Sequence, residues 1–430
     1  MIDAQPTEPP RRSPWAWIPT LYLLQGLPYV VVMTLSVVMY ENLGLSNTDI
    51  ALYTSWLYLP WVIKPLWSPI IELLGTRRRW IWVLQFAVGA LLAMVALTLP
   101  TEQWVRWSLA ILWLMAFASA SHDIAADGYY MMALPTHQQA AFVGIRSTFY
   151  RVANIAGQGG LVYLAGELTE RSGSVVWAWQ IVMALLAGFF VVAGAYHAWC
   201  LPHAPDDRPG RMQSGLFLEF FAVLAAYFRK PAIAVGIAYL LLYRFPEAQL
   251  LKLAVPFLLD PLEAGGLGLA TREVGVEYGT VGLIALTVGG ITGGLLIARF
   301  GLKRCLWPLV WGMHLPNLVF LAMALWPPQQ LWVVSTALAA EQFGYGVGFA
   351  AYLMVMILIA DGAHKTAHYA ICTGFMALGM MVPGFWSGWL QEQLGYVGFF
   401  TWVMVAAIPS FIMTALIRVP DSFGRKEAAA

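Results

Sequence analysis

Charged side chains are scarce in this chain of 430 residues. Asp, Glu, Lys and Arg together make up 11% of the sequence and hydrophobic residues make up 60%, whereas an ordinary soluble domain carries about 25% charged residues. The mean hydropathy is +0.68. No soluble core could absorb so much apolar surface, so the composition excludes an ordinary soluble protein.

Cysteine is rare as well, and several enzyme motifs are missing. The three isolated cysteines, Cys200, Cys305 and Cys372, fall near predicted cytoplasmic helix ends, so no disulfide is expected. The sequence contains no G-x-x-x-x-G-K-[ST] phosphate loop, which excludes ATP hydrolysis by that motif. It shows no metal-ligand cluster and no catalytic Ser, Cys or His constellation, and its net charge is only +1. We therefore predict no enzyme activity, no cofactor or metal, and no nucleic-acid partner.

What the chain has instead is a series of long apolar segments. A membrane-spanning helix needs about 20 mainly apolar residues, whereas the strands of a membrane β-barrel are about half as long and alternate in polarity. The sequence therefore predicts an all-α polytopic membrane protein with about twelve spans. These lie near residues 15–40, 48–72, 79–99, 105–132, 139–165, 175–201, 231–257, 272–298, 303–326, 329–360, 366–391 and 396–418.

The distribution of Lys and Arg predicts the orientation. Cytoplasmic loops carry the excess of these residues. Sixteen Lys and Arg residues fall on the side of the N-terminus and three, Arg106, Arg171 and Arg272, on the other. We therefore expect both termini in the cytoplasm. The first segment is too long for the apolar core of a signal peptide and lacks a small-residue cleavage site, so we expect it to remain in the mature protein.

The longest polar interruption, residues 202–230, divides the chain into two halves. We predict a tail at 1–14, a six-helix bundle at 15–201, a cytoplasmic linker at 202–230, a second six-helix bundle at 231–418 and a tail at 419–430. The second half of the linker, 213–228, is expected to form an amphipathic helix on the cytoplasmic surface.

A repeated loop supports this division. The stretches Ser68–Arg78 and Gly294–Arg304 align on Gly75 and Gly301, and each has basic residues two and three positions after its glycine. Parallel six-helix repeats are typical of the major facilitator architecture. The loops resemble its gating-loop signature in degraded form, and the alternative is that the basic residues only obey the positive-inside rule. The candidate loop residues are Glu72, Gly75, Arg77, Arg299 and Gly301.

Two aspartates, Asp123 and Asp127, lie within the fourth apolar segment. An acid near the centre of a bilayer costs roughly 2.5 to 3.5 kcal/mol on insertion scales and survives where it has a partner or a function. At about 1.5 Å per residue, Asp123 lies about 14 Å deep and Asp127 about 8 Å deep, matching Arg151 and Arg146 on the fifth segment. We predict the pairs Asp123–Arg151 and Asp127–Arg146. They either act in proton coupling or substrate binding, or lock two helices together.

Other polar residues are candidates for a cavity. Asn154 and Gln158 share a predicted helix face with Arg151, at i, i+3 and i+7 spacing. His122 points about 100° away from Asp123. His314 and Asn317 are expected to be packing residues. The further cavity candidates, each with helix packing, snorkelling or an interhelical lock as the alternative, are Gln25, Tyr29, Lys64, Arg244, Glu247, Glu341 and Tyr345.

Three stretches carry a resemblance to a known family. They are similar to signatures of the AmpG-like branch of the major facilitator superfamily, also called the peptide–acetyl-CoA transporter family. His122 departs from the family's usual glutamine. The resemblance covers the N-terminal half by motif and the C-terminal half mainly by topology. The stretches are Gln25-Gly26-Leu27-Pro28-Tyr29, Lys64-Pro65-Leu66-Trp67-Ser68-Pro69 and Asp123-Ile124-Ala125-Ala126-Asp127-Gly128.

The resemblance implies twelve transmembrane helices in two six-helix bundles, and a secondary transporter in the bacterial inner membrane. AmpG permeases import anhydro-muropeptides released by cell-wall turnover, driven by protons, and relatives carry acetyl-CoA or siderophores. A siderophore or acyl-CoA importer, or a sensor without flux, remains an alternative. We expect a monomer whose partners are the lipid bilayer and a small-molecule substrate, with the proton gradient as driving force. The aromatic residues Trp56, Tyr58, Trp61 and Trp67 suit either sugar stacking or an interfacial belt.

Overall fold

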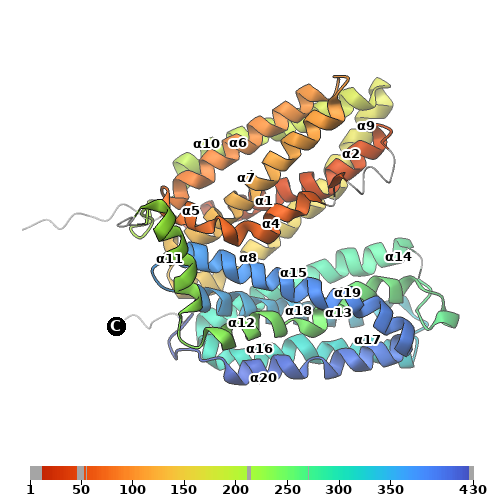
Figure 1. The fold of residues 1–430 in the computed structure, drawn as a ribbon. Coiled ribbons are helices and arrows are strands. Elements are labelled where there is room, and N and C mark those ends of the chain that lie inside the picture. The colour runs from red at the N-terminus through yellow and green to blue at the C-terminus, as the bar shows by residue number, and fades with distance from the viewer. Residues whose placement is uncertain (1–11, 46–52, 55, 211–214, 270, 426–430) are drawn as a thin grey trace, which may run out of the picture. The chain divides into compact units, whose positions relative to one another are not determined.

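The protein is helical throughout the part that the computed structural model describes, which is residues 12–45, 53–54, 56–210, 215–269 and 271–425. These residues form helices and no strand (Figure 1). Eight helices within them are long and apolar enough to cross a membrane, or nine if the bent pair Phe217–Phe228 and Ile233–Leu259 is one span. The prediction of an all-α polytopic fold is confirmed.

The helices before the linker coincide with the first six predicted segments. The second segment, 48–72, is built from short helical pieces, and part of it lies outside the described residues. Two segments contain a π-helical turn, at Val31–Leu35 and Ala156–Leu161. The helices are α1 (Ile18–Val30), α2 (Ser36–Asn42), α4 (Leu59–Ile63), α5 (Ser68–Leu73), α6 (Arg77–Thr98), α7 (Trp104–Ala133), α8 (Thr136–Ile155), α9 (Val162–Ser172) and α10 (Val175–Cys200).

The later helices coincide with the linker helix and the last six predicted segments. The longest, α19, bends at Gly395 (φ 65°, ψ 175°), which separates the predicted segments 366–391 and 396–418. A third π-helical turn lies at Glu277–Gly282. The helices are α11 (Leu216–Phe228), α12 (Ile233–Leu242), α13 (Phe245–Leu259), α14 (Thr271–Val276), α15 (Leu283–Phe300), α16 (Leu302–His314), α17 (Leu318–Leu325), α18 (Leu331–Ala360), α19 (Lys365–Val405) and α20 (Ile408–Leu416).

The chain forms two compact units. Unit 1 comprises residues 1–63, 70–133 and 149–211, and unit 2 comprises 64–69, 134–148 and 212–430. Two short segments that precede the linker, 64–69 and 134–148, therefore pack with unit 2. Each unit is described here by itself.

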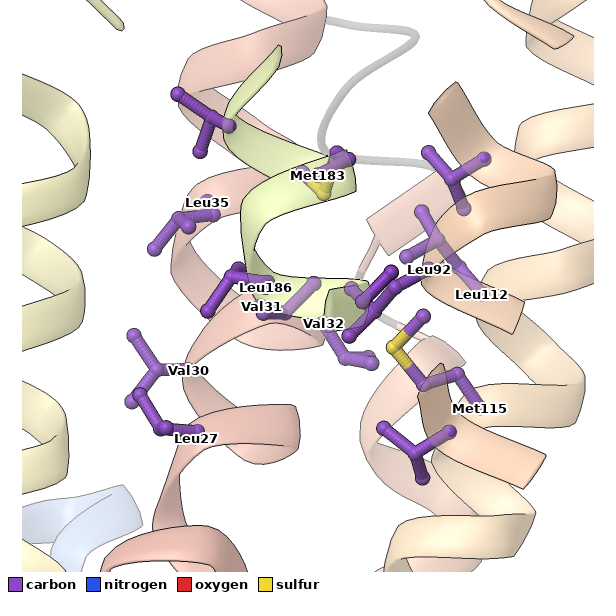
Figure 2. Packing of buried hydrophobic residues seen from close by; sticks show 14 of the residues in the cluster. Leu27, Val30, Val31, Val32, Leu35, Leu92, Leu112, Met115, Met183 and Leu186 are labelled. Atoms are coloured by element: carbon purple, nitrogen blue, oxygen red, sulfur yellow. The ribbon is translucent and has the colours of Figure 1, made fainter. Parts of the chain in front are cut away.

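The core of unit 1 lies between α1, α6, α7 and α10. Figure 2 shows its side chains meeting between these helices, with Val31 and Val32 of the π-helical turn among Leu92 of α6, Leu112 of α7 and Leu186 of α10. Large apolar side chains also cover the outside of the same helices, and Leu97 and Val192 are 72% and 70% exposed. A surface this apolar fits lipid rather than water.

In unit 2, glycines on α15 bring helices into backbone contact. A Cβ atom added at Gly289 would lie 2.1 Å from the carbonyl oxygen of Phe343 on α18, and one added at Gly293 would lie 2.7 Å from that of Val347. On the next face, a Cβ atom added at Gly294 would lie 2.4 Å from the carbonyl oxygen of Ala140 on α8. Small residues four apart allow helices to approach this closely in membranes.

The predicted linker helix is present as α11, but it is not amphipathic. Val223 and Tyr227 are buried, whereas Phe217, Leu218 and Phe221 are 74%, 62% and 52% exposed. The prediction of a polar face was wrong because the stretch Leu216–Phe228 contains a single charged residue, Glu219.

Neighbouring glycines of α15 provide a matched test of this packing. Gly289→Ala places a methyl group against backbone that cannot move aside, so we expect it to lower the free energy of unfolding by roughly 1–3 kcal/mol. Gly290→Ala is the control, because its added Cβ atom would meet nothing nearer than 3.7 Å. Thermal unfolding of both variants in detergent checks this, and equal melting temperatures would contradict it.

Candidate functional site

Two hydrogen bonds hold the acids of α7 against α1. Tyr22 donates its hydroxyl to Oδ1 of Asp127 at 3.1 Å, and Gln25 donates Nε2 to Oδ1 of Asp123. The order is reversed between the helices, as expected for antiparallel neighbours, and each helix supplies side chains about one turn apart. Asp127 is buried and Asp123 half-buried. Both carboxylates thus lie on the α1-facing side of α7.

The arginines predicted to pair with these acids lie on α8. Arg151 belongs to unit 1 and is half-buried, whereas Arg146 belongs to unit 2. The Arg146 guanidinium is buried and donates to the hydroxyl of Tyr369 at 3.3 Å. The pairs Asp123–Arg151 and Asp127–Arg146 stay predictions.

The polar face predicted along the fifth segment is interrupted. Asn154 donates its side-chain amide to the carbonyl oxygen of Tyr150 at 2.9 Å, one turn back on its own helix. Gln158 shares a face with Arg151 only if the α-helix is continuous between them. The π-helical turn at Ala156–Leu161 breaks that continuity. The side chain of Gln158 lies outside the described residues.

His122 faces away from the α1 contact, as its position on α7 predicts. Its Nε2 lies 3.0 Å from Nε2 of Gln85 on α6, and Oε1 of Gln85 lies 2.9 Å from Nδ1 of His197 on α10. Nε2 of His197 lies 2.9 Å from Oγ1 of Thr20 on α1. This polar chain ties four helices together inside unit 1. Polar residues isolated in apolar segments were the available signal for Gln85 and His197.

Aromatic rings gather around Tyr29. Its ring centroid lies 5.2 Å from that of Trp61 and 6.3 Å from that of Tyr58, and the Tyr58 and Trp61 rings are stacked at 6.3 Å. Tyr150 lies 6.5 Å from Tyr29. All four residues are half-buried and belong to unit 1. Trp56, which the sequence grouped with them, is 61% exposed.

Lys64 is buried within unit 2, with a relative exposure of 6%. The adjoining Pro65 packs against α19, where a Cβ atom at Gly374 would lie 2.8 Å from the proline ring. Ser68 donates its hydroxyl to the carbonyl oxygen of Pro65 at 3.0 Å. The lysine therefore sits in a short segment fixed to the helices of unit 2.

The break between α12 and α13 places Arg244 among aromatic rings. Arg244 precedes the first turn of α13, and Pro246 lies in that turn. Its guanidinium donates to the hydroxyl of Tyr345 and lies 4.7 Å from the ring of Phe349, both on α18. Such contacts stabilise a buried cation without neutralising it.

Two candidate acids of unit 2, Glu247 and Glu341, are also buried. Glu247 on α13 accepts from His314 and Asn317, so the expectation that those two residues only fill space was wrong. Glu341 on α18 accepts a 2.9 Å hydrogen bond from the neighbouring Gln342. Each of these acids therefore has a polar neighbour inside the unit.

The first repeated loop is held by the segment that follows α10. Asp207 accepts hydrogen bonds from the backbone N–H groups of Arg77 at 2.7 Å and Arg78 at 2.9 Å. Thr76 caps the start of α6, where its hydroxyl oxygen accepts the N–H of Arg79. These N–H groups begin α6 and have no partner within the helix. The Arg77 side chain also pairs with Glu72 at 2.5 Å. The basic residue after Gly75 thus has defined partners, beyond any effect of its charge on topology.

The second repeated loop is held in the corresponding way, by the segment that follows α20. Leu302 donates its N–H to the carbonyl oxygen of Phe423 at 2.9 Å, and Lys303 pairs with Asp421. This lysine lowers the pKa of the exposed Asp421 carboxyl, through a hydrogen bond and its charge. Gly75 and Gly301 both have positive φ, 97° and 84°, which favours glycine. Arg299 is exposed and lies over the ring of Phe300.

Known proteins are similar to this chain in sequence or in fold. The BT1 family model matches residues 25–235. An anhydromuropeptide permease of Escherichia coli is 26% identical over 83% of this chain and 70% of its own length. An uncharacterized protein of Haemophilus influenzae is 26% identical over 90% of both chains. The solved structure of the major facilitator transporter FucP in the outward conformation aligns with a TM-score of 0.68 over 94% of this chain and 98% of its own, at 14% identity.

The chain is AmpG-like and has the major facilitator fold. The AmpG-like resemblance of its three sequence stretches is thereby confirmed. In an AmpG-like chain, the acids of α7 and the repeated loops are the features that call for direct tests.

The contact between α1 and α7 is tested by a double-mutant cycle. Tyr22→Phe removes only the hydroxyl, and Asp127→Asn removes only the charge. A hydrogen bond to a charged group is worth about 1.5–3 kcal/mol, so the two changes together should cost less than the sum of their separate costs. Unfolding measured for the single and double variants checks this. Strict additivity would contradict a direct bond.

The hydrogen bonds that hold the first repeated loop are tested at their acceptor, Asp207. Asp207→Ala removes the acceptor of the Arg77 and Arg78 N–H groups and a carboxylate 3.7 Å from the Arg77 guanidinium, so we expect a loss of roughly 1–2 kcal/mol in the free energy of unfolding. The adjacent Asp206 is exposed, and Asp206→Ala is the matched control. Thermal unfolding of the two variants should differ, and a wild-type melting temperature for Asp207→Ala would contradict this role.

Proposed function

We propose that this multi-pass membrane protein imports anhydro-muropeptides into the bacterial cytoplasm, coupled to protons and by alternating access between its two halves. It is a transporter and not an enzyme. The substrate is suggested by the anhydromuropeptide permease of Escherichia coli, to which the chain is similar over most of its length. We place it in the inner membrane, as a monomer with both termini in the cytoplasm.

The observation that carries the proposal is the pair of acids on α7. Asp123 and Asp127 lie one turn apart in an apolar helix, and α1 donates a hydrogen bond to each. A second negative charge within one turn is costly in low dielectric. Binding of a proton relieves that cost, so the pair is suited to carry a proton through the transport cycle. A change in protonation would then alter the hydrogen bonds that Tyr22 and Gln25 of α1 donate to these acids.

Several cationic residues suit an anionic solute. Arg146, Arg151, Lys64 and Arg244 are the arginines and lysine expected along the cavity, and muropeptides carry carboxylates that such groups bind. The half-buried rings around Tyr29 suit the flat faces of sugar rings. We therefore assign the aromatic cluster of unit 1 to the disaccharide of the substrate.

Uptake into proteoliposomes tests the proposal. Labelled anhydro-muropeptide should accumulate in vesicles containing the wild-type protein when an inward proton gradient is imposed, and a protonophore should abolish the accumulation. Asp123→Asn and Asp127→Asn each remove a protonatable carboxylate, so each variant should lose accumulation above the equilibrium level.

The exposed acid Glu392 provides the control variant, Glu392→Gln, which should accumulate substrate like the wild type. Absence of uptake by folded wild-type protein would overturn the muropeptide assignment, and the same assay would then be run with acyl-CoA and a siderophore. Binding without uptake of any of these would indicate a sensor. Proton-driven accumulation by both aspartate variants would overturn the coupling role of α7.

A further inference from the structure

A carboxylate, an imidazole and a hydroxyl lie in a row inside unit 2. Oε1 of Glu247 on α13 lies 2.7 Å from Nδ1 of His314 on α16, and Nε2 of His314 lies 2.6 Å from Oγ of Ser410 on α20. Asn317 adds a second donor to Oε1 of Glu247, at 3.3 Å. Three helices that are far apart in sequence thus converge on one buried acid.

The cluster is sealed inside the unit. Glu247 and His314 are each 1% exposed and Ser410 is 0% exposed. The ring of Phe411 packs against His314 with centroids 5.5 Å apart, and that of Tyr243 at 5.9 Å. The row resembles the order of groups in a hydrolytic triad, but a serine without surface cannot reach a substrate. The geometry therefore favours a role in holding a proton over one in attacking a bond.

One oxygen of the acid lacks a donor. Oε2 of Glu247 and Oδ1 of Asn317 are buried acceptors without a hydrogen-bond partner among the described residues. A buried acceptor left unpaired costs about 1–3 kcal/mol, and more when it is charged. The cluster therefore has room for one further proton, which would bring the net charge of the Glu247–His314 pair to zero.

Other ionisable groups surround the cluster on each packed helix. Arg244 lies three residues before Glu247 in α13, but its guanidinium is directed to Tyr345 and Phe349 of α18. Tyr243, at the end of α12, and Glu341, on α18, interact electrostatically with Glu247. Glu341 is thus a further titratable carboxyl group near the cluster.

We propose that Glu247 and His314 form a second proton-binding site, in the C-terminal half of the transporter. In the empty state, His314 is neutral, donates Nδ1–H to Glu247 and accepts the hydroxyl hydrogen of Ser410 at Nε2. One proton then binds to Nε2, which donates to Oγ of Ser410, and the serine hydroxyl no longer donates to the ring. The pair changes from a net charge of −1 to 0, and no other bond is made or broken.

The position of this site suits coupling to movement. Glu247 lies in the first turn of α13, directly after the break that follows α12, and Arg244 lies at the break itself. Loss of the negative charge changes the electrostatic environment of the break between α12 and α13. The inference rests on the proposed function for its role in transport, but proton binding itself is measured without substrate.

Nitrogen NMR of histidine-labelled protein tests proton binding directly. The signal of His314 is the one lost in His314→Gln. In the wild type it should change from neutral to charged imidazole as the pH is lowered from about 8 to about 5. In Glu247→Gln, which keeps the shape of the side chain, that change should be lost. The exposed His203 supplies a reference signal in every sample.

Two outcomes would overturn the site. One is a wild-type His314 that keeps one protonation state across this range while infrared spectra show no protonation of Glu247. The other is a His314 signal that titrates identically in Glu247→Gln, which would make the histidine independent of the acid. Ser410→Ala is a second, milder variant in case Glu247→Gln does not fold, and it should shift the midpoint of the His314 titration.

Transport assays then separate this site from the proposed substrate. Glu247→Gln should still exchange labelled for unlabelled muropeptide at equal concentrations, but should lose accumulation driven by a proton gradient. Glu392→Gln should retain both. If the wild type carries no muropeptide, the proposed function fails while the NMR result still decides the proton site. If Glu247→Gln accumulates substrate like the wild type, the site is not part of coupling.

Discussion

A polar side chain inside a lipid-facing bundle must find its partner within the protein, because the hydrocarbon core of a bilayer offers none. Several of the described polar residues follow that constraint in both units. Asp123 and Asp127 of α7 are tied to α1, and His122 is joined through Gln85 and His197 to Thr20. In unit 2, Glu247 gathers His314 and Asn317. Each network joins helices that are distant in sequence, so the same bonds that satisfy the polar groups also fix the order of packing.

The sequence was sufficient to predict the class of fold, since hydropathy alone specifies long apolar helices and the loop repeat indicates two related halves. It also identified the acids of α7 and the basic residues of the two repeated loops. The packing of α15 could be read from the sequence as well. Close packing needs a missing side chain at a fixed helical spacing, which a sequence displays directly as Gly289, Gly293 and Gly290, Gly294.

Partners across helices could not be predicted in the same way. Depth along a helix matched Asp123 and Asp127 with arginines of the fifth segment, but it could not reveal that Tyr22 and Gln25 of α1 reach the same carboxylates. His314 and Asn317 are predicted from the sequence to be packing residues, whereas the acid that they contact lies 67 and 70 residues away. The π-helical turn at Ala156–Leu161 likewise alters helical phase without any composition that signals it. Rotation about the helix axis and tertiary pairing are the quantities that a single sequence leaves open.

Each repeated loop contacts an aspartate from a later segment, but the two contacts differ in burial. In unit 1, Asp207 and Arg77 are 8% and 2% exposed, and the aspartate completes the start of α6 through two backbone N–H groups. In unit 2, the side chains of Lys303 and Asp421 are 56% and 86% exposed, so water and salt screen their pairing. The buried contact of Asp207 therefore fixes the first loop. The exposed Lys303–Asp421 pair adds little to the second loop beyond the backbone hydrogen bond from Leu302 to Phe423.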